Sequence, residues 1–384
     1  MKPYRIYLSV PHMGGREEEY VRDAFRTNWL STVGPNLHGF EQEMADRLGH
    51  GTGGLAVASG TAALHLVLRA LDVGPGDRVA VSTLTFAGSV FPIQYLGAEP
   101  VFLDSEENSW NLSADLVEEY FRSAASRGRL PKVLVAVHLY GQHADIDRIG
   151  AACDAFGVAL VEDAAESLGG TYRGRQTATR APHSILSFNG NKMITTTGGG
   201  MVIAKDADSL ARMRKWANQS REPALEYLHA ETGYNYRMSN VLAGIGRGQL
   251  HVLDDRVAAR RGVAARYAAV VEEFDGVTMQ AEANWGMHSR WLSVLHFDPS
   301  RCPARPLDIL RALDARGIES RPVWRPMHTQ PLYAGAERVG GDVAVRLFEN
   351  GLCLPSSSRL STAEQDEVIE TLRGCLSSVG AAQS

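Results

Sequence analysis

The sequence predicts an α/β protein with a mostly parallel sheet covered by helices, followed by a smaller α+β unit. Short apolar runs alternate with helical patterns through the first part of the chain. The runs are rich in β-branched residues and nearly uninterrupted, as in strands that are buried on both faces. The composition shifts after Asp275–Gly276, and 384 residues leave room for more than one domain.

The expected elements of the large unit follow in chain order. Residues 61–72 carry an apolar face at helical spacing, and residues 78–82 form a short apolar run after the turn 74–77. A helical pattern covers 86–96, and further strands are expected at 100–103, 133–139, 158–162, 184–188 and 201–204. Strand runs that alternate with helices predict βαβ units and a parallel sheet.

The rest of the chain has a different pattern. Residues 239–274 are helical in spacing and rich in alanine and arginine. A strand is expected over 291–296, and helices over 306–316 and 362–376. We therefore predict a large domain of residues 1–255 and a small α+β domain of residues 256–384, with the N-terminal segment packing on the small domain.

Composition and charge exclude several classes of protein. The chain is 44% hydrophobic and 22% charged, which is ordinary for a globular protein, and its net charge of -5 gives no general attraction to nucleic acid or anionic lipid. Its four cysteines form no CxxC pair, so we expect free thiols and no metal site. Without a signal-like or membrane-spanning apolar run, we expect a cytoplasmic protein with no membrane or nucleic-acid partner.

The first candidate site is a turn of small residues, Ser59, Gly60 and Thr61, that opens into the apolar helix. Glycine allows a close approach of the backbone, and a helix N-terminus offers unpaired N–H groups and a positive dipole end. The segment therefore suits a phosphate. An ordinary helix cap explains the same residues, and on this segment alone we favour it by about two to one.

Two further candidates follow later strands. Glu162, Asp163 and Glu166 lie at the end of one, where α/β proteins bind ligands, although a solvated strand end explains them equally well. Lys192 lies between the next strand and the glycines 198–200. Most lysines are surface charges, but a lysine placed here can act as a nucleophilic amine that forms Schiff bases.

The order of the three candidates points to one cofactor. A pyridoxal phosphate site needs a phosphate cradle, an acid for the ring nitrogen and a lysine amine, and the sequence supplies them in that order. A nicotinamide dehydrogenase is excluded, because no G-x-G-x-x-G follows the first predicted strand.

On these residues the chain resembles the DegT/DnrJ/EryC1/StrS family of sugar aminotransferases, which have the fold-type-I architecture. The resemblance covers nearly the whole chain. It rests on the segments 8–15, 27–29 with 34–35, 58–64, 137–142, 162–167, 187–200, 233–239 and 351–355.

The resemblance implies a role for each candidate residue. Lys192 would form the Schiff base with pyridoxal 5'-phosphate, Asp163 would pair with the pyridinium nitrogen, and Phe86 would stack on the ring. Glu166 stands where many relatives have glutamine near the cofactor's 3-oxygen, and its role stays open because a carboxylate repels a phenolate unless a proton is shared. The other implied cofactor-binding residues are Ser59, Gly60, Thr61, Ser187, Asn189 and Asn235.

Partners follow from the same resemblance. Asn235 would reach the phosphate of the neighbouring subunit, which implies a homodimer with shared active sites. The implied substrate-binding residues are Trp29, Asn189, Arg237, Arg325 and His328. For His328, a loop histidine that bonds to the backbone is an equally good interpretation.

The implied reaction is a two-stage transamination with pyridoxamine 5'-phosphate as the intermediate form. L-glutamate would give its amino group to a nucleotide-linked 4-keto-6-deoxy sugar, with UDP or dTDP as the nucleotide. The motif around the lysine, Ser-Phe-Asn-Gly-Asn-Lys at 187–192, looks most like that of the branch acting on UDP-linked 4-keto-6-deoxy-N-acetylhexosamines. A 3-keto-sugar or cyclitol aminotransferase stays open. A sugar 3-dehydratase, in which histidine replaces the lysine, and a non-catalytic regulatory homologue are disfavoured by Lys192 together with Asp163.

Overall fold

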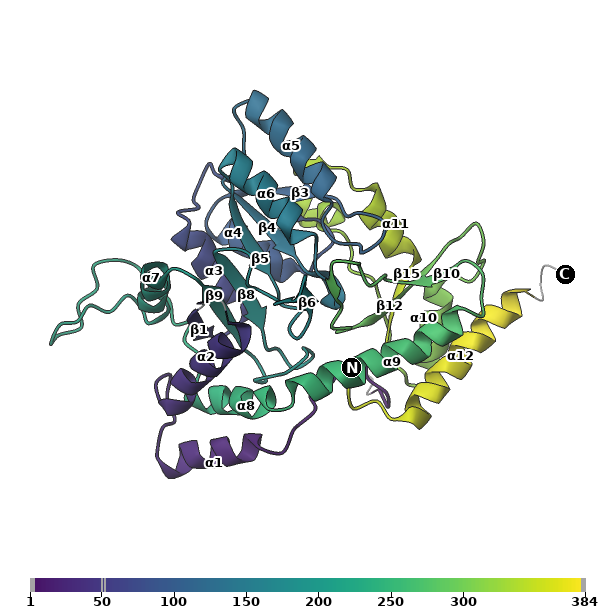
Figure 1. The fold of residues 1–384 in the computed structure, drawn as a ribbon, viewed down its shortest axis with the longest axis horizontal. Helices are drawn as coiled ribbons and strands as arrows, with labels where there is room; N and C mark the ends of the chain where they lie inside the picture. Colours follow the sequence, from purple (N-terminus) through teal and green to yellow (C-terminus); the bar gives the residue numbers. More distant parts are fainter. Residues whose placement is uncertain (1–3, 50, 52, 381–384) are drawn as a thin grey trace.

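A large mixed sheet forms the centre of the computed structural model, which describes residues 4–49, 51 and 53–380 (Figure 1). Its strands are β1 (Gly53–Val57), β2 (Arg78–Ser82), β3 (Glu99–Leu103), β4 (Val133–Val137), β5 (Ala159–Asp163), β8 (His183–Ser187), β9 (Gly200–Ala204) and β14 (Arg338–Val339). The order is β1-β9-β8-β5-β4-β2-β3-β14. From β8 to β14 all neighbours are parallel, whereas β9 is antiparallel to both β1 and β8. The predicted α/β class with a mostly parallel sheet is confirmed.

Helices cover both faces of this sheet, because the strands are apolar on both sides. One face packs against α3 (Gly60–Ala70), α4 (Phe91–Tyr95) and α7 (Ala207–Ala217). The other packs against α5 (Ala114–Ser126) and α6 (Ile146–Phe156). At the β1 edge lie α2 (Pro35–Leu48) and α8 (Asn240–Leu250), with α1 (Glu17–Arg26) packed on α8.

A second, antiparallel sheet follows in the order β10-β12-β15-β13. Its strands are β10 (Val277–Met279), β12 (Ser293–Phe297), β13 (Arg321–Pro322) and β15 (Gly351–Leu354). Apolar side chains of α9 (Leu253–Val271), α10 (Pro306–Ala315) and α12 (Thr362–Gly380) form a core against it. α11 (Asp342–Asn350) also contacts this sheet, and a small sheet joins β6 (Thr171–Tyr172), β7 (Arg175–Gln176) and β11 (Gly286–Met287).

Most predicted elements lie within a few residues of the observed ones, but two helical predictions need correction. The pattern over 86–96 forms only a 3-10 turn, Ala87–Ser89, and the short α4, because Pro92 suits only the first turn of a helix. The pattern over 239–274 divides into α8 and α9 at Val252, whose backbone leaves the helical region (φ -114°, ψ 9°). Further 3-10 turns are Leu139–Gly141, Met327–Thr329 and Pro331–Tyr333.

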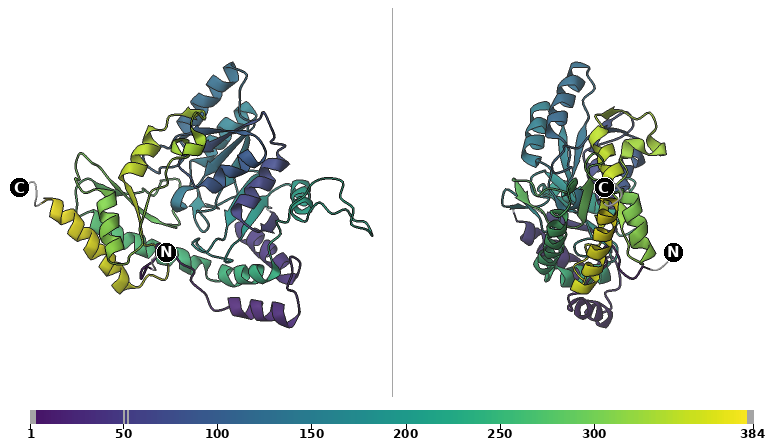
Figure 2. Two further views of the ribbon diagram at one scale, coloured as in Figure 1. Left: turned by 180° about the vertical axis from the view of Figure 1, so that it is seen from behind. Right: turned by 90° about the vertical axis from the view of Figure 1, so that its right-hand side faces the viewer.

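Two segments leave the regular layers. Near the N-terminus, Ile6 bridges Ile318, and Leu8 O accepts a hydrogen bond from Ser356 N at 2.8 Å, so this segment lies beside the second sheet. The boundary at 255/256 itself stays a prediction. After α7, residues 218–235 form an arm that projects from the body in Figure 1 and in the left view of Figure 2. No helix among the described residues has the length and apolar character to cross a membrane.

Candidate active site

The candidate site lies at the carboxyl ends of strands β1, β5 and β8 of the large sheet. Residues Val57 and Ser187, the last of β1 and β8, both pair with Gly200, so these two strand ends lie on either side of one residue. β5 runs parallel to β8 and ends at Asp163. A cavity of about 330 Å³ opens at these strand ends, and the segments that follow the strands line it.

One wall of the cavity is the N-terminus of α3. Ser59 caps this helix, and its Oγ accepts a hydrogen bond from Ala62 N at 3.0 Å. The N–H groups of Gly60 and Thr61 belong to the first turn, which an α-helix leaves without intrahelical acceptors. A Cβ on Gly60 would lie 3.2 Å from Ser187 Cβ, so glycine lets the helix approach the end of β8 closely. The wall therefore presents N–H and hydroxyl groups that suit an anion.

Asp163 lies buried in the cavity wall, with 4% of its surface exposed. Its Oδ2 accepts the hydroxyl of Ser89 at 2.7 Å, and its Oδ1 accepts Ala165 N at 3.0 Å. Ser89 is in turn bonded to Thr85 at 2.8 Å. These contacts fix the direction of the carboxylate while leaving it capacity to accept a bond from a ligand.

Lys192 reaches the same cavity from the turn after β8. Its backbone N–H donates to Asn189 O at 2.9 Å, which closes the turn. The amine Nζ lies 3.6 Å from Glu166 Oε1 and 3.9 Å from the centre of the Trp291 ring. A carboxylate and an aromatic face both attract a positive charge, so the two groups hold the amine on one side of the cavity.

Glu166 is buried beside Lys192, and its backbone surroundings are strained. Its Oε2 accepts Tyr140 N at 2.8 Å, and Tyr140 has a positive φ of 56°, which is uncommon for a residue with a side chain. Burial raises the pKa of the Glu166 carboxyl, although Lys192 and the Tyr140 N–H lower it, and Asp163 raises it further. Burial thus makes the charged form of this carboxyl less favourable than in water, and the Lys192 amine offsets part of that effect.

This pKa predicts how Glu166→Gln changes stability with pH. A raised folded-state pKa means that the contribution of Glu166 is fully present below its unfolded value of about 4.3 and is lost as pH rises through the folded value. The Tm of Glu166→Gln relative to the native apoprotein should therefore rise as the pH increases from the unfolded pKa of about 4.3 through the raised folded pKa. Thermal unfolding across this range measures it. A fall over the same range would mean that the attraction of Lys192 outweighs burial.

Two aromatic rings stand at the mouth of the cavity. Phe86 is 60% exposed, and its ring lies 5.7 Å from that of Trp324. Both residues line the cavity. An aromatic ring with a free face at a cavity mouth can stack on a planar ligand.

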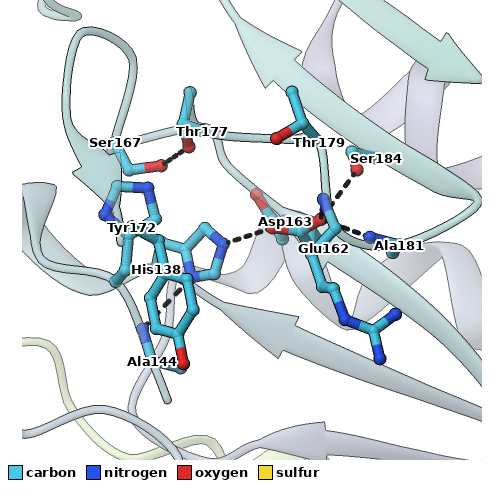
Figure 3. A network of polar contacts seen from close by, with 12 residues as sticks. His138, Ala144, Glu162, Asp163, Ser167, Tyr172, Thr177, Thr179, Ala181 and Ser184 are labelled. Atoms are coloured by element: carbon cyan, nitrogen blue, oxygen red, sulfur yellow. Dashed lines mark hydrogen bonds and ion pairs between the residues drawn. The ribbon is translucent and has the colours of Figure 1, made fainter. Parts of the chain in front are cut away.

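Behind Asp163, a buried polar network holds the end of β5 in place (Figure 3). His138 Nδ1 accepts Ala144 N at 3.3 Å, so Nε2 carries the proton donated to Glu162 at 2.9 Å. Glu162 also accepts Ala181 N at 2.7 Å, and its pKa is lowered because these hydrogen bonds outweigh burial, which alone would raise it. His138 N donates to the Asp163 carbonyl at 3.0 Å.

The structure brings most of the predicted cofactor residues to this one cavity, and their roles stay predictions. Those that line it are Ser59, Gly60, Thr61, Phe86, Asp163, Glu166, Ser187, Asn189 and Lys192. The exception is Asn235, which is exposed on the arm, where it bridges Asn218.

The other predicted substrate residues lie outside the cavity lining. Arg237 is buried in an ion pair with Glu41 at 2.6 Å, so its charge is already paired in this subunit. Arg325 is exposed and bonds to Thr329 at 3.2 Å. His328 Nδ1 lies 2.6 Å from Thr83 Oγ1. Trp29 is 44% exposed in the turn after α1.

Several lining residues carry no signal that sequence patterns could reveal. Trp291, Trp324 and Ser89 line the cavity, and none of the three is among the predicted site residues. The two tryptophans come from the C-terminal part of the chain, and only tertiary packing places them beside Lys192 and Phe86. Ser89 could have been suspected only from the polar residues between β2 and α4.

Comparison with known proteins gives consistent matches. A model of the DegT/DnrJ/EryC1/StrS aminotransferase family matches residues 11–373. EpsN of Bacillus subtilis (strain 168), named as a pyridoxal phosphate-dependent aminotransferase, is 47% identical over 96% of this chain and 95% of its own. GDP-perosamine synthase of Caulobacter vibrioides is 37% identical over 96% and 97%. The structure of DesI in the presence of its TDP-sugar product is 25% identical, with a TM-score of 0.87 over 98% of this chain and 93% of that one.

Proposed function

Because this chain belongs to the DegT/DnrJ/EryC1/StrS aminotransferase family, we propose that it aminates a nucleotide-linked 4-keto-6-deoxy sugar with L-glutamate as the amino donor. The enzyme is a pyridoxal phosphate-dependent aminotransferase of fold type I. One observation carries the proposal: Asp163, Lys192 and the N-terminus of α3 line a single cavity.

The cavity residues fit pyridoxal phosphate on structural grounds. The first turn of α3 and Ser187 offer donors for the phosphate, and a Cβ on Gly60 would crowd Ser187 in this wall. Asp163 is a buried carboxylate with capacity to accept a hydrogen bond from the protonated ring nitrogen. When bound, the cofactor supplies an aldehyde that takes up the amino group and a ring that accepts electrons from the reacting carbon.

Each remaining task falls to residues of the chain. Lys192 Nζ would act first as a general base, taking the proton from the donor's α-carbon. It would then act as a general acid, delivering that proton to the C4' carbon of the bound cofactor. Glu166, 3.6 Å away, places a carboxyl group beside this amine, and burial raises the pKa of that carboxyl. Asp163 would place a carboxylate beside the ring nitrogen of the bound cofactor, and Ser89 fixes its direction through a hydrogen bond of 2.7 Å.

The sugar would enter at the mouth of the cavity. There Phe86, Trp324 and the exposed Asn189 offer apolar faces and an amide for a sugar ring. Support for a nucleotide-linked acceptor comes from two relatives, one named GDP-perosamine synthase and the other solved with its TDP-sugar product. We therefore add GDP to UDP and dTDP as a nucleotide to be tested.

We further propose that two subunits share their sites. The exposed apolar side chains include Phe25 in α1, Trp29, Leu30 and Val33 after it, and Leu225 and Tyr227 on the arm. Leu225, Tyr227 and Leu228 are all exposed within four residues of the arm, and a second subunit could cover this apolar segment. Asn235 lies at the base of the same arm, so a partner that covers the arm brings this amide close to the neighbouring cavity.

A panel of acceptors tests the proposed reaction. We expect L-glutamate to convert the bound cofactor to its amino form, and a 4-keto-6-deoxy sugar linked to UDP, dTDP or GDP to restore it with release of a 4-amino sugar. Mass spectrometry of the product and ping-pong kinetics are the measurements. If only 3-keto sugars or keto-cyclitols restore the cofactor, the fold and cofactor stand and the proposed acceptor is wrong.

A further inference from the structure

Arg260 of α9 is a buried cation whose contacts in the described part of the chain are all neutral. Only 1% of its surface is exposed. Its Nη1 donates to the carbonyls of Trp291 at 2.6 Å and Ser356 at 3.1 Å, and its Nη2 donates to Ser9 Oγ at 2.9 Å and Lys192 O at 3.4 Å. Burial lowers the pKa of Arg260 to about 9, with a smaller effect of Arg256. A buried charge without a countercharge is expensive, so its position calls for an explanation.

The acceptors of Arg260 belong to the framework around the lysine turn. Asn191 O, one residue before Lys192, accepts the Ser9 hydroxyl at 2.7 Å and Trp291 Nε1 at 2.7 Å. Arg260 contacts both of these donor residues and also Lys192 O. The guanidinium thus joins the N-terminal segment, the lysine turn and the segment before β12 at one point.

The same framework fixes the surroundings of the Lys192 amine. The Trp291 ring lies 3.9 Å from Nζ, and Arg260 holds the Trp291 carbonyl. A planar guanidinium can bridge several acceptors in fixed directions, whereas a lysine ammonium at the same position cannot span them. Moving any one of the three segments would change where the Lys192 amine lies in the cavity.

We infer that Arg260 is a positioning residue, which holds the lysine turn and the Trp291 ring so that the amine of Lys192 faces the cavity in one orientation. This inference rests on the proposed role of Lys192 and assigns α9 a part in cofactor attachment. Attachment joins the amine to the aldehyde of pyridoxal phosphate with loss of one water, and its rate depends on the placement of the amine.

The chain offers a matched control on the same helix. Arg256 lies one turn before Arg260, is also nearly buried, and donates from Nη2 to Met13 O at 3.0 Å. It therefore anchors the N-terminal segment without contacting the lysine turn. An Arg256 variant therefore shows the effect of losing a buried arginine that anchors the N-terminal segment. An Arg260 variant loses such an anchor and also the contact to the lysine turn.

The test measures attachment rather than turnover. The full-length protein is stripped of cofactor and supplied again with pyridoxal phosphate, and the rate of absorbance change is measured. Borohydride trapping and peptide mapping then show whether residue 192 is labelled. We expect Arg260→Lys to slow attachment about tenfold or more, Ser9→Ala to slow it less, and Arg256→Lys to stay within about twofold of the native rate.

The outcomes separate the possible failures. A native rate in Arg260→Lys, or an equal slowing in Arg256→Lys, overturns the positioning role. If Arg260→Lys does not fold, Ser9→Ala decides, because it removes one link of the framework without a change of charge, and a native rate there overturns the inference. If the native protein is trapped at another residue than Lys192, the proposed function itself fails.

Discussion

Lys192→Ala is expected to lose transamination entirely within the sensitivity of a coupled assay, and to lose the absorbance band of the covalently attached cofactor. The lysine amine provides both the attachment point and the proton transfer, and a positioned acid–base group alone contributes about 10²–10⁴-fold to rate. The fold should survive, because the side chain lies in the cavity wall and its loss opens space toward the cavity rather than in the core. Near-ultraviolet circular dichroism and Tm measure this.

Lys205→Ala is the matched control for that variant. Lys205 lies just after β9 and donates to Arg180 O at 3.0 Å, away from the cavity lining. It should keep native activity and cofactor binding. Unchanged turnover in Lys192→Ala would eliminate the proposed mechanism, whereas loss of turnover in both variants would point to a general effect of removing a positive charge.

Asp163→Asn is expected to reduce kcat strongly while the cofactor still attaches to Lys192. The amide is close in shape but carries no charge to pair with the ring nitrogen. Breaking one buried ion pair typically costs about 3–5 kcal/mol, which corresponds to a loss in rate of roughly 10²-fold to 4 × 10³-fold at about 1.4 kcal/mol per factor of ten. Single-turnover kinetics with L-glutamate measures the step directly.

Ser89→Ala forms a graded partner to this variant. It removes one hydrogen bond of 2.7 Å to Asp163 Oδ2 but leaves the carboxylate in place. A hydrogen bond to a charged group contributes about 1.5–3 kcal/mol, so the loss should be smaller than in Asp163→Asn. If Asp163→Asn keeps the native single-turnover rate, Asp163 does not pair with the ring nitrogen.

The parts of the candidate site that lie at the ends of strands were predictable from the sequence. The apolar runs before Asp163 and Lys192 identify buried strands, and parallel strands place their carboxyl ends at one edge of the sheet. The cap at Ser59 was predictable from its residue type alone. Periodicity and residue order therefore sufficed for the α/β class and for the acid, amine and helix N-terminus of the cavity.

The rest depends on contacts between distant segments, which local patterns do not contain. Trp291 reaches Lys192 only because the segment before β12 packs against the lysine turn. Arg237 lies within the family-like segment 233–239, yet its direction is set by Glu41 from α2. The helix predicted over 86–96 is short because Gly88 and Pro92 interrupt it, and the resulting irregular turn is what brings Ser89 to Asp163.

The pairing of β14 with β3 has a consequence for any attempt to express the first part of the chain alone. β14 comes from residues 338–339, yet it covers the outer edge of a sheet that is otherwise built from the first part of the chain. A truncated product ending at residue 255 would leave the N–H groups of Phe102 and Asp104 without their acceptors, Glu337 O and Val339 O, and would open this edge of β3 to edge-to-edge association. Such a fragment should sediment as aggregates, and co-expression with the missing C-terminal piece should return it to solution.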